Sequence, residues 1–546
     1  MMGQMMDRPL MISSIIDYAA DYHPNAEIVS ARVEGDIHRY TYREARERIA
    51  QLAHALIGLG VKPGDRVATV AWNGYRHFEL YYAISGIGAV CHTINPRLFR
   101  DQLIYVVNHA SDRLIFTDAT FVPLLEGLRE ELPDGLRFVV MADRDAMPDQ
   151  GLVDALCYEE LLEGQATDIE WPEFDERAAA SLCYTSGTTG NPKGSLFSHR
   201  STLLHTMGML AIDGGGISPR DRLMPVVPLF HANSWGTAYT CPLKGTSLVF
   251  PGPNMSGEGL FDLMQAEKVS SAWGVPTIWI GLLARMRELG RAPDGFKVVI
   301  IGGSAAPEPM IREFETDYGV SVVHGWGMTE MSPIGSLGVL EPKYDSGSLD
   351  ERIVLKTAQG RRMYGVDLKI VDDDGNRLPH DGVAFGELLV RGHGIVSGYF
   401  EDEAAAANSF DDDGWFRTGD VARIDADGFM SVVDRTKDVV KSGGEWISSI
   451  DLENTALGHP ELQECAVIGL PHPKWDERPM LIAIRVAGST VTDADVREFL
   501  EGKIAKWWMP DDVVFVDELP HTATGKLSKL TLRQQFKDHV LSTVGE

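Results

Sequence analysis

The residues with the clearest chemical potential lie in one short segment, Thr185–Gly194, directly after the apolar run Ala178–Cys183. The segment reads TSGTTGNPKG and holds three glycines, four hydroxyl side chains and one lysine, Lys193. Glycine lets backbone N–H groups approach an anion, hydroxyls donate hydrogen bonds and lysine supplies positive charge. The segment does not match the GxxxxGK[ST] pattern of a Walker A loop, and its composition alone also fits a plain surface loop. We expect it to bind a polyphosphate.

Further short motifs that combine glycine, charged and aromatic residues follow along the chain. They are Pro228–His231 (PLFH), Gly302–Ala305 (GGSA), Gly325–Glu330 (GWGMTE), Trp415–Asp420 (WFRTGD), Asp434–Asp438 (DRTKD) and Thr524–Lys526 (TGK). Together with Tyr184–Ser198, YTSGTTGNPKGSLFS, they resemble in content and order the signature motifs of the adenylate-forming superfamily. That superfamily includes acyl-CoA synthetases, peptide-synthetase adenylation domains and luciferases. Each motif is weak alone, but their common order over nearly the whole chain makes the resemblance specific.

The resemblance implies a reaction in two steps. A carboxylate attacks the α-phosphorus of ATP to give an acyl-adenylate and pyrophosphate, and the thiol of CoA then displaces AMP. The first step brings one anion to another, so catalysis depends on positioning and on electrostatic stabilisation. We therefore expect an ATP-dependent acid–thiol ligase, an AMP-forming acyl-CoA synthetase, with ATP, Mg²⁺ and CoA as its cofactors.

The resemblance also assigns residues to the nucleotide and to CoA. The implied set is Thr185, Ser186, Gly187, Thr188, Thr189, Gly190, Lys193, Gly302, Gly303, Ser304, Gly325, Trp326, Gly327, Met328, Asp420, Arg435, Lys441, Gly443, Gly444 and Glu445. Residues 185–193 would hold the β- and γ-phosphates, and residues 302–304 would line the adenine pocket. Trp326 occupies a position where the family usually has an aromatic residue, often Tyr, stacked on adenine. Asp420 and Arg435 would bind the ribose hydroxyls, although by themselves they also fit a surface ion pair.

Four residues take catalytic roles by the same resemblance: Lys526, His231, Thr329 and Glu330. Lys526 would bridge the substrate carboxylate and the α-phosphate, and Thr329 would hydrogen-bond the α-phosphate. Glu330 would hold Mg²⁺, for which oxygen is the preferred ligand atom. His231 matches a family histidine at the junction of the acyl and nucleotide sites, and without that match a buried core histidine explains it equally well.

The resemblance implies two domains, residues 1–434 for the ATP and acyl sites and residues 435–546 as a C-terminal lid. Lys437 stands at the family's hinge position. Rotation there would withdraw Lys526 and bring Lys441–Trp446, KSGGEW, to the adenylate. Glycines in that segment let a pantetheine arm pass close to the backbone. This is a domain-closure mechanism.

The acyl site is expected to involve Trp235, Gly302, Gly327 and Pro333. A tryptophan in a context like that of Trp235 gates the acyl tunnel in fatty-acyl synthetases, but it could equally form the floor of a short pocket. The chain looks most similar to methylmercaptopropionate-CoA ligases and medium- to long-chain fatty-acyl-CoA synthetases. We expect methylmercaptopropionate or a similar short- or medium-chain carboxylate as substrate. Broad specificity is expected, because one methylene changes binding by only about 1–3 kcal/mol.

Two other functional classes remain open from the sequence. One is a stand-alone adenylation domain that loads a carrier protein, although no carrier segment with a modifiable serine is expected after Lys526 or before Thr41. The other is a nucleotide-binding module without catalysis, which the retention of Glu330, Asp420 and Lys526 disfavours. A luciferase-type oxygenase has no distinguishing sequence feature. Ser195 and Ser304 depart from the common family residues without removing a catalytic group.

Composition restricts the possible partners. The chain has 546 residues, with 50 Lys and Arg against 79 Asp and Glu, and its net charge is −29. This charge disfavours nucleic acid and anionic membrane surfaces as partners. Neither a run of about 18 apolar residues nor a signal peptide is apparent. The five cysteines contain no CxxC pair, so each is expected to be a small buried residue in the reducing cytoplasm. A homodimer is expected from the family.

The elements that must position these motifs alternate between helix and strand. Residues 42–59 carry apolar side chains every three or four positions, Thr41 and Glu44 form a capping box, and Gly60 follows as a stop. Strands are expected at Arg66–Ala71, Leu114–Thr117, Phe138–Met141, Ser247–Phe250, Lys297–Ile301 and Val320–His324, and an apolar helix–strand segment at Phe78–Val90. Such alternation predicts open, largely parallel sheets.

The pattern changes after about residue 360. Asp367–Val371, Gly386–Arg391 and Gly428–Val433 are short and separated by turns, as in antiparallel or barrel-like structure. Helices at Ser449–Leu457 and Asp493–Ala505 then alternate with strands at Glu464–Ile468 and Met480–Val486. These patterns agree with the α/β fold that the family resemblance implies: a large N-terminal domain of two open α/β sheets plus a distorted β-barrel, and a small mobile C-terminal α+β domain.

Overall fold

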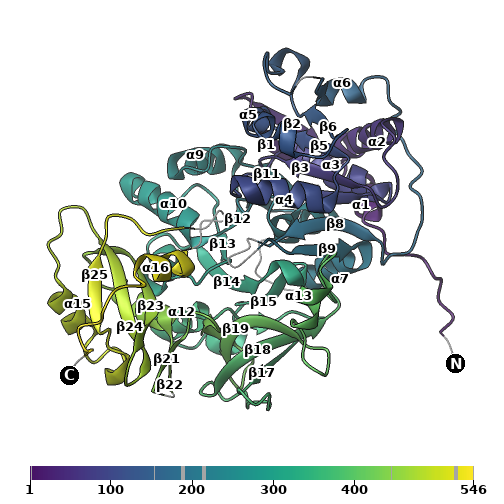
Figure 1. The fold of residues 1–546 in the computed structure, drawn as a ribbon. Helices are drawn as coiled ribbons and strands as arrows, with labels where there is room; N and C mark the ends of the chain where they lie inside the picture. The colour runs from purple at the N-terminus through teal and green to yellow at the C-terminus, as the bar shows by residue number, and fades with distance from the viewer. Residues whose placement is uncertain are drawn as a thin grey trace.

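The computed structural model describes residues 1, 3–152, 154–185, 191–211, 217–443, 445–521 and 527–544. Within these ranges the strands form four sheets, of nine, seven, five and four strands. Figure 1 shows the chain running from the N-terminal α/β region through a central region to a separate C-terminal group of strands and helices. The two larger sheets confirm the two α/β sheets predicted from the helix–strand alternation.

The nine-stranded sheet has the order β16-β15-β14-β13-β12-β10-β11-β1-β2. Its strands are β1 (Glu27–Ala31), β2 (Ile37–Thr41), β10 (Arg222–Pro225), β11 (Ser247–Phe250), β12 (Ser271–Gly274), β13 (Val298–Ile301), β14 (Ser321–Gly327), β15 (Ile334–Leu337) and β16 (Arg361–Arg362). The six strands from β14 to β1 in this order pair in parallel. Their carboxyl ends therefore meet at one edge, where open α/β sheets place ligand sites.

The seven-stranded sheet has the order β7-β6-β5-β3-β4-β8-β9. Its strands are β3 (Arg66–Val70), β4 (Val90–Thr93), β5 (Leu114–Thr117), β6 (Arg137–Val140), β7 (Leu156–Cys157), β8 (Ala179–Tyr184) and β9 (Gly194–Ser198). Only β9 is antiparallel to its neighbour, β8. The turn from β8 to β9 contains the expected polyphosphate loop, so that loop lies at the carboxyl end of a parallel strand.

Helices cover and separate these sheets (Figure 1). The longer ones are α1 (Ser13–Tyr22), α2 (Tyr42–Gly58), α3 (Tyr75–Gly86), α4 (Arg100–Ala110), α7 (His199–Leu210), α8 (Thr237–Lys244), α9 (Gly257–Glu267), α10 (Pro276–Leu289), α11 (Glu308–Thr316) and α12 (Leu349–Thr357). In α2 the capping box of Thr41 and Glu44 is present, and Gly60 adopts φ +84°, so both predicted ends of this helix are confirmed.

Four antiparallel strands follow, in the order β17-β18-β19-β20. They are β17 (Val366–Val371), β18 (Phe385–Gly392), β19 (Phe416–Ile424) and β20 (Met430–Arg435). An isolated bridge between Gly360 and Met430 links β20 to the segment that enters β16. The region predicted as a distorted barrel is thus an antiparallel sheet attached to the nine-stranded sheet. Strand β20 begins later than predicted, because Gly428, with φ +84°, lies in the preceding turn.

The C-terminal sheet consists of β21 (Val440–Ser442), β22 (Glu445–Ile447), β23 (Leu462–His472), β24 (Asp476–Arg485) and β25 (Asp512–Phe515). Helices α14 (Ser449–Ala456), α15 (Asp493–Leu500) and α16 (Lys529–Gln535) accompany it. Helix α15 ends earlier than the predicted Ala505, because Gly502 takes φ +76°, outside the right-handed helical region. The α+β character of this region is confirmed.

The core consists mainly of apolar side chains between the sheets and their helices, with Trp273, Trp279 and Phe250 among the largest fully buried ones. All five cysteines are free and buried, as predicted: Cys91, Cys157, Cys183, Cys241 and Cys465. Among the described residues, none of the helices has the length and apolar character needed to cross a membrane.

Candidate functional site

The predicted motifs converge on the carboxyl edge of the nine-stranded sheet. The PLFH motif follows β10, the GGSA motif follows β13, and the GWGMTE motif runs from the end of β14 into the short 3-10 helix η5 (Thr329–Met331). Because β10, β12, β13 and β14 are parallel neighbours, these three motifs lie at one edge although about 100 residues separate the first from the last.

The ends of the expected polyphosphate loop are held together. Thr185 N donates to Lys193 O at 2.9 Å, and Lys193 N donates to Thr185 Oγ1 at 3.2 Å. Ser186, Gly187, Thr188, Thr189 and Gly190 lie outside the described residues, so their predicted contacts stay predictions. The two described ends show that the loop leaves and re-enters the sheet at adjacent points of β8 and β9.

Lys193 and Glu330 both contact Tyr399, a residue that no sequence motif singles out. Tyr399 Oη donates to Glu330 Oε1 at 2.9 Å, and Lys193 Nζ lies 4.9 Å from the centre of the Tyr399 ring. Glu330 is only 7% exposed. Burial raises the pKa of its carboxyl group, although Tyr399, Arg435 and Lys193 all oppose that rise. The carboxylate therefore lies in a buried setting with two nearby cations.

Asp420 and Arg435 face each other on neighbouring strands β19 and β20. Arg435 Nε lies 2.9 Å from Asp420 Oδ1, and Trp326 Nε1 donates to Asp420 Oδ2 at 2.8 Å. Asp420 is buried while Arg435 is 44% exposed. The carboxylate is thus oriented from both sides, and the Asp420–Arg435 pair is more than a surface ion pair. The bond from Trp326 is specific to an indole, since a tyrosine ring has no N–H.

Three glycines near this edge let neighbouring residues pack closely against the backbone. A methyl group at Gly327 would lie 2.1 Å from Pro333 O, and one at Gly325 would lie 2.8 Å from Leu337 Cδ2. At Gly302 a methyl group would lie 3.1 Å from Trp235 Cη2. Gly302 therefore packs against Trp235, and Gly327 packs against Pro333. The four residues predicted for the acyl site thus form two contacting pairs.

The segment after His231 has an unusual backbone. Ala232, Asn233, Ser234 and Trp235 all have φ between 45° and 55°, and Gly236 has φ 79°, which makes one left-handed helical turn. Left-handed conformations cost L-residues roughly 1–2 kcal/mol each. Hydrogen bonds hold the turn in place: Asn233 Nδ2 donates to Ser181 Oγ at 2.8 Å, and Ser234 Oγ donates to Val227 O at 2.9 Å. Trp235 is consequently fixed, 5% exposed, against Gly302.

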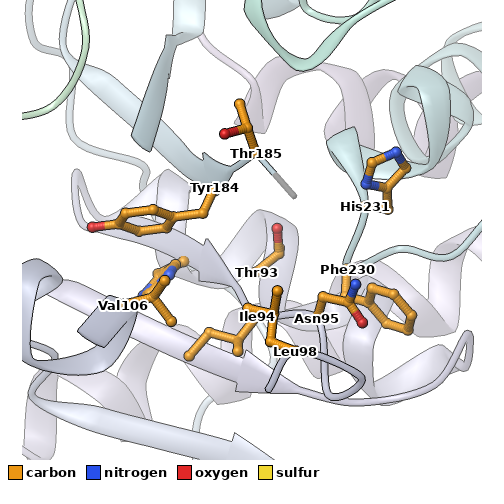
Figure 2. A pocket seen from close by; sticks show the side chains of 10 residues that line it. Thr93, Ile94, Asn95, Leu98, Val106, Tyr184, Thr185, Phe230 and His231 are labelled. Atoms are coloured by element: carbon orange, nitrogen blue, oxygen red, sulfur yellow. The ribbon is translucent and has the colours of Figure 1, made fainter. Parts of the chain in front are cut away.

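A cavity joins the polyphosphate loop to the PLFH motif. Its lining residues are His92, Thr93, Ile94, Asn95, Leu98, Val106, Tyr184, Thr185, Phe230 and His231. Figure 2 shows Thr185 and His231 at the top of this cavity, with Ile94 and Leu98 at the bottom. Thr185 comes from the seven-stranded sheet and His231 from the nine-stranded one. The two sheets therefore contribute to a common site.

The C-terminal sheet places the predicted hinge and thiol-step residues in one region. Lys437 follows β20, and burial lowers the pKa of its ammonium group. Lys441 lies on β21, with its Nζ 5.3 Å from the centre of the Trp446 ring. Gly443 takes φ 61°, and its N–H donates to Trp475 O at 2.8 Å. Glu445 begins β22. Gly444 and Lys526 lie outside the described residues, so their predicted roles stay predictions.

The residues present suit a Mg²⁺ ion held jointly with a nucleotide. Among the described residues, no group of three or more His, Cys, Asp or Glu side chains is arranged to enclose a metal. Mg²⁺ commonly binds proteins through one or two carboxylates together with substrate phosphates and water. Glu330 offers such a carboxylate, whose Oε1 atom accepts from Tyr399 Oη. The donor set therefore fits Mg²⁺ only together with a nucleotide.

Comparison with known proteins agrees with this arrangement. The family model of AMP-binding enzymes matches residues 16–400, and the model of the AMP-binding enzyme C-terminal domain matches residues 451–526. The chain is 51% identical to a 3-methylmercaptopropionyl-CoA ligase of Ruegeria lacuscaerulensis over 538 residues, which cover 98% of this chain and 99% of that protein. It is 48% identical to a medium-chain-fatty-acid–CoA ligase of Ectopseudomonas oleovorans over 542 residues, which cover 99% and 98%.

Among solved structures, the fold matches an anthranilate CoA ligase in complex with anthranoyl-AMP. The TM-score is 0.85 at 26% sequence identity, and the match covers 97% of this chain and 98% of the other. These matches confirm the resemblance to adenylate-forming enzymes that the motifs indicated. The chain therefore belongs to the family of AMP-binding enzymes.

Proposed function

We propose that this protein is an AMP-forming acid–thiol ligase that converts a short- or medium-chain carboxylate into its CoA thioester. One observation supports the proposal most directly. Glu330, Lys193, Arg435 and Asp420 surround the edge to which the GGSA and GWGMTE motifs belong, and the two cations influence the same buried carboxylate. This arrangement supplies an oxygen ligand for Mg²⁺ and positive charge for a polyphosphate without a direct ion pair between Glu330 and either cation among the described residues.

In the first step, an oxygen of the substrate carboxylate attacks the α-phosphorus of ATP, and the bond to the β-phosphate oxygen breaks. Thr185 and Lys193 are proposed to bind the β- and γ-phosphates, which leave as pyrophosphate. Thr329 is proposed to donate to the α-phosphate, and Lys526 to bridge it to the carboxylate. Bound Mg²⁺ would neutralise part of the charge that develops on the phosphates. Catalysis is then mainly positioning and charge stabilisation.

Orientation of the nucleotide is proposed to come from the two neighbouring antiparallel strands. Asp420 accepts from the ribose hydroxyls and Arg435 donates to them, and the bond from Trp326 keeps the Asp420 carboxylate in one rotamer. Gly302, Gly303 and Ser304 line the adenine pocket with Trp326 beside it. Gly325, Gly327 and Met328 complete this wall. The four glycines of this set carry no side chain, so the backbone itself would form much of the wall against a planar base.

In the second step, the CoA thiol attacks the acyl carbon of the adenylate, the carbonyl re-forms and AMP leaves. We propose that residues 435–546 turn as a unit at Lys437, which exchanges Lys526 for the β21–β22 hairpin with Lys441, Gly443, Gly444 and Glu445. A Lys437→Pro variant should then lose thioester formation and keep most of its acid-dependent pyrophosphate release. Equal loss of both half-reactions would contradict the hinge.

For the acid, we propose methylmercaptopropionate or an alkyl acid of similar length. Two relatives, at 51% and 48% identity over nearly the full chain, bear names that specify 3-methylmercaptopropionyl-CoA and medium-chain fatty acids. A short pocket is consistent with the left-handed turn, which holds Trp235, 5% exposed, against Gly302. We therefore interpret Trp235 as a wall of the pocket. His231, at the start of the turn, is proposed to contact the substrate carboxylate.

The test is kcat/KM with ATP and CoA across propionate, butyrate, methylmercaptopropionate, hexanoate and palmitate. We expect thioester formation with a maximum between butyrate and hexanoate. A maximum at palmitate would overturn the short-acid proposal, and absence of acid-dependent pyrophosphate release with every acid would overturn the ligase itself. Replacement of CoA by a phosphopantetheinylated carrier protein distinguishes a carrier-loading enzyme, which would work better with the carrier.

Two further properties follow from the same family membership. We propose a homodimer, which sedimentation analysis tests, and a cytoplasmic location, which fractionation of cells tests. The five free buried cysteines are compatible with a reducing compartment.

A further inference from the structure

Tyr399 contacts two charged groups to which the proposed function gives different ligands: Lys193 for the polyphosphate and Glu330 for Mg²⁺. Its ring faces the Lys193 ammonium, with Nζ 4.9 Å from the ring centre, and its hydroxyl donates to Glu330 Oε1 at 2.9 Å. Among the described residues, neither Lys193 nor Glu330 forms an ion pair with any partner. Both groups thus keep their charge available while they are linked through one neutral side chain.

Backbone hydrogen bonds fix the segment that carries Tyr399 on two sides. Phe400 N donates to Gly194 O at 2.8 Å, directly after Lys193, and Val396 N donates to Glu330 O at 2.9 Å. Ser332 Oγ also donates to Gly394 O at 2.8 Å. The segment therefore connects the polyphosphate loop to the metal-binding motif, and the position of Tyr399 does not depend on its own side-chain contacts.

An ammonium and a carboxylate in a partly buried site attract each other strongly, because the local dielectric constant is low. If they paired directly, each would neutralise the other at the place where the phosphates and Mg²⁺ need them. An aromatic face offers the ammonium a weaker partner, worth about 0.5–2 kcal/mol in general. A phenol hydroxyl orients the carboxylate without adding charge. A tyrosine at this position therefore satisfies both groups without cancelling them.

We propose that Tyr399 is a positioning residue that aims Glu330 at Mg²⁺, aims Lys193 at the polyphosphate, and keeps the two from pairing. The inference rests on the proposed nucleotide site. It assigns to Tyr399 no contact with the reacting atoms. Hydrogen-bond partners of metal-binding carboxylates commonly determine metal affinity, which makes the metal dependence of nucleotide binding the property to measure.

The structure supplies a matched control. Lys343 Nζ lies 4.9 Å from the centre of the Tyr344 ring, and Tyr344 Oη donates to Asp427 Oδ2 at 2.6 Å. This set also combines a lysine, a tyrosine and a carboxylate, here an aspartate in place of the glutamate, and it lies on the surface. A Tyr344→Phe variant therefore removes an equivalent hydroxyl with no expected effect on nucleotide binding.

The first experiment is calorimetric titration of ATP into the full-length protein, without acid or CoA, in Mg²⁺ and in EDTA. In the wild type and in Tyr344→Phe, Mg²⁺ should increase ATP affinity by the same factor. In Tyr399→Phe this gain should shrink roughly tenfold, while affinity in EDTA stays unchanged because the ring still holds Lys193. An unchanged gain in Tyr399→Phe, or an equal loss in Tyr344→Phe, overturns the proposal.

The second experiment tests the separation of charges. Tyr399→Leu should also lower ATP affinity in EDTA, because Lys193 can then pair with Glu330. Adding Glu330→Gln to Tyr399→Leu should restore that affinity, since no carboxylate remains to capture the lysine; failure to restore it overturns the separating role. Neither measurement uses thioester formation. A protein that binds MgATP as expected but activates no acid would refute the ligase function and leave this inference standing.

Discussion

The buried set Lys193–Tyr399–Glu330 and the exposed set Lys343–Tyr344–Asp427 contain the same chemistry in two settings. The distance from lysine Nζ to the tyrosine ring centre is 4.9 Å in both, and both tyrosine hydroxyls donate to the carboxylate. They differ in ion pairing: Lys343 pairs directly with Asp427 at 2.6 Å and with Glu341 at 3.5 Å, whereas no ion pair joins Lys193 to Glu330 among the described residues. The exposed set contains a direct ion pair, and in the buried set neither charge forms an ion pair with a described residue.

The pKa values of the two carboxyl groups, Asp427 and Glu330, are also shifted in opposite directions. The bonds from Lys343 and Tyr344 lower the pKa of Asp427, which lies in water. Burial raises the pKa of Glu330 even though its neighbours oppose the rise. In the buried set, desolvation exceeds the stabilisation that one phenol and two nearby cations provide. Such an uncompensated carboxylate costs stability and is typical of a binding site, whereas the exposed set is typical of a surface contact.

The largest expected difference between the two sets is in catalytic rate, when each carboxylate is neutralised in turn. Glu330→Gln should lower acid-dependent pyrophosphate release by roughly 100-fold or more, because the proposed metal oxygen is lost at the point where phosphate charge develops. Asp427→Asn should leave the rate unchanged. The two variants are compared by continuous pyrophosphate assay at saturating ATP. Similar rates in both would remove the functional distinction between the sets.

The next largest expected difference is in the KM for ATP when the lysine of each set is replaced. Lys193→Met should raise the KM for ATP by roughly 10-fold or more, because a charge-assisted bond to a phosphate oxygen contributes about 1.5–3 kcal/mol. Lys343→Met keeps a similar length of side chain and should not change this KM. Steady-state titration of ATP at saturating acid and CoA measures both. An unaltered KM in Lys193→Met would place the lysine outside the phosphate site.

The third prediction concerns a second neutral hydrogen-bond donor, the indole of Trp326, which orients a carboxylate as the Tyr399 hydroxyl does. Asp420 receives its neutral bond from Trp326 Nε1. Trp326→Phe keeps a stacking ring and removes that bond, so the KM for ATP should rise by about 3- to 10-fold with little change in kcat. Trp326→Tyr, which has the residue common in the family, tests whether a hydroxyl can replace the indole N–H. A change in kcat alone would argue against a role in ribose binding.

The smallest expected effect is on stability, and its sign should differ between the sets. For Glu330 the folded-state pKa is raised, so its contribution to stability is present at low pH and lost as pH rises. Glu330→Gln should therefore melt about 1–3 °C higher than the wild type at about pH 8, without ligands, and should match it at about pH 4.

For Asp427 the pKa is lowered, so its contribution is present above the ordinary aspartate range and lost as pH falls. Asp427→Asn should melt slightly lower than the wild type at about pH 8, and the difference should vanish on acidification. Thermal denaturation followed by circular dichroism measures all three proteins. Shifts of the same sign in both variants would contradict the opposite roles of burial.

The sequence predicted those parts of the molecule in which local patterns decide. The capping box of Thr41 and Glu44 and the stop at Gly60 depend only on neighbouring residues, and both are present. The order of the motifs predicted the family, and the helix–strand alternation predicted open, largely parallel sheets. Segment ends marked by glycine were less reliable, because Gly428 and Gly502 could extend an element or end it, and their positive φ angles end it.

Contacts between distant segments had no sequence signal. Tyr399 lies 69 residues after Glu330 and 206 after Lys193 in the chain, and no spacing rule links a lone tyrosine to either. The same holds for the bond from Trp326 to Asp420 and for the left-handed turn at residues 232–236, which contains only one glycine. The predicted roles of Ser186, Gly190 and Lys526 lie outside the described residues and stay predictions.

Substitutions in the left-handed turn would alter how firmly Trp235 is held, and so would act on the proposed acyl pocket indirectly. Glycine is the residue best suited to such a backbone, so Ser234→Gly would fit the turn and at the same time delete the bond from Ser234 Oγ to Val227 O. A library restricted to residues 232–234 would thus vary how firmly the indole is held while every pocket-lining side chain stays the same. If Trp235 forms a wall of the acyl pocket, as proposed, chain-length preference would change through the backbone turn behind that wall, with no substitution among the pocket-lining side chains.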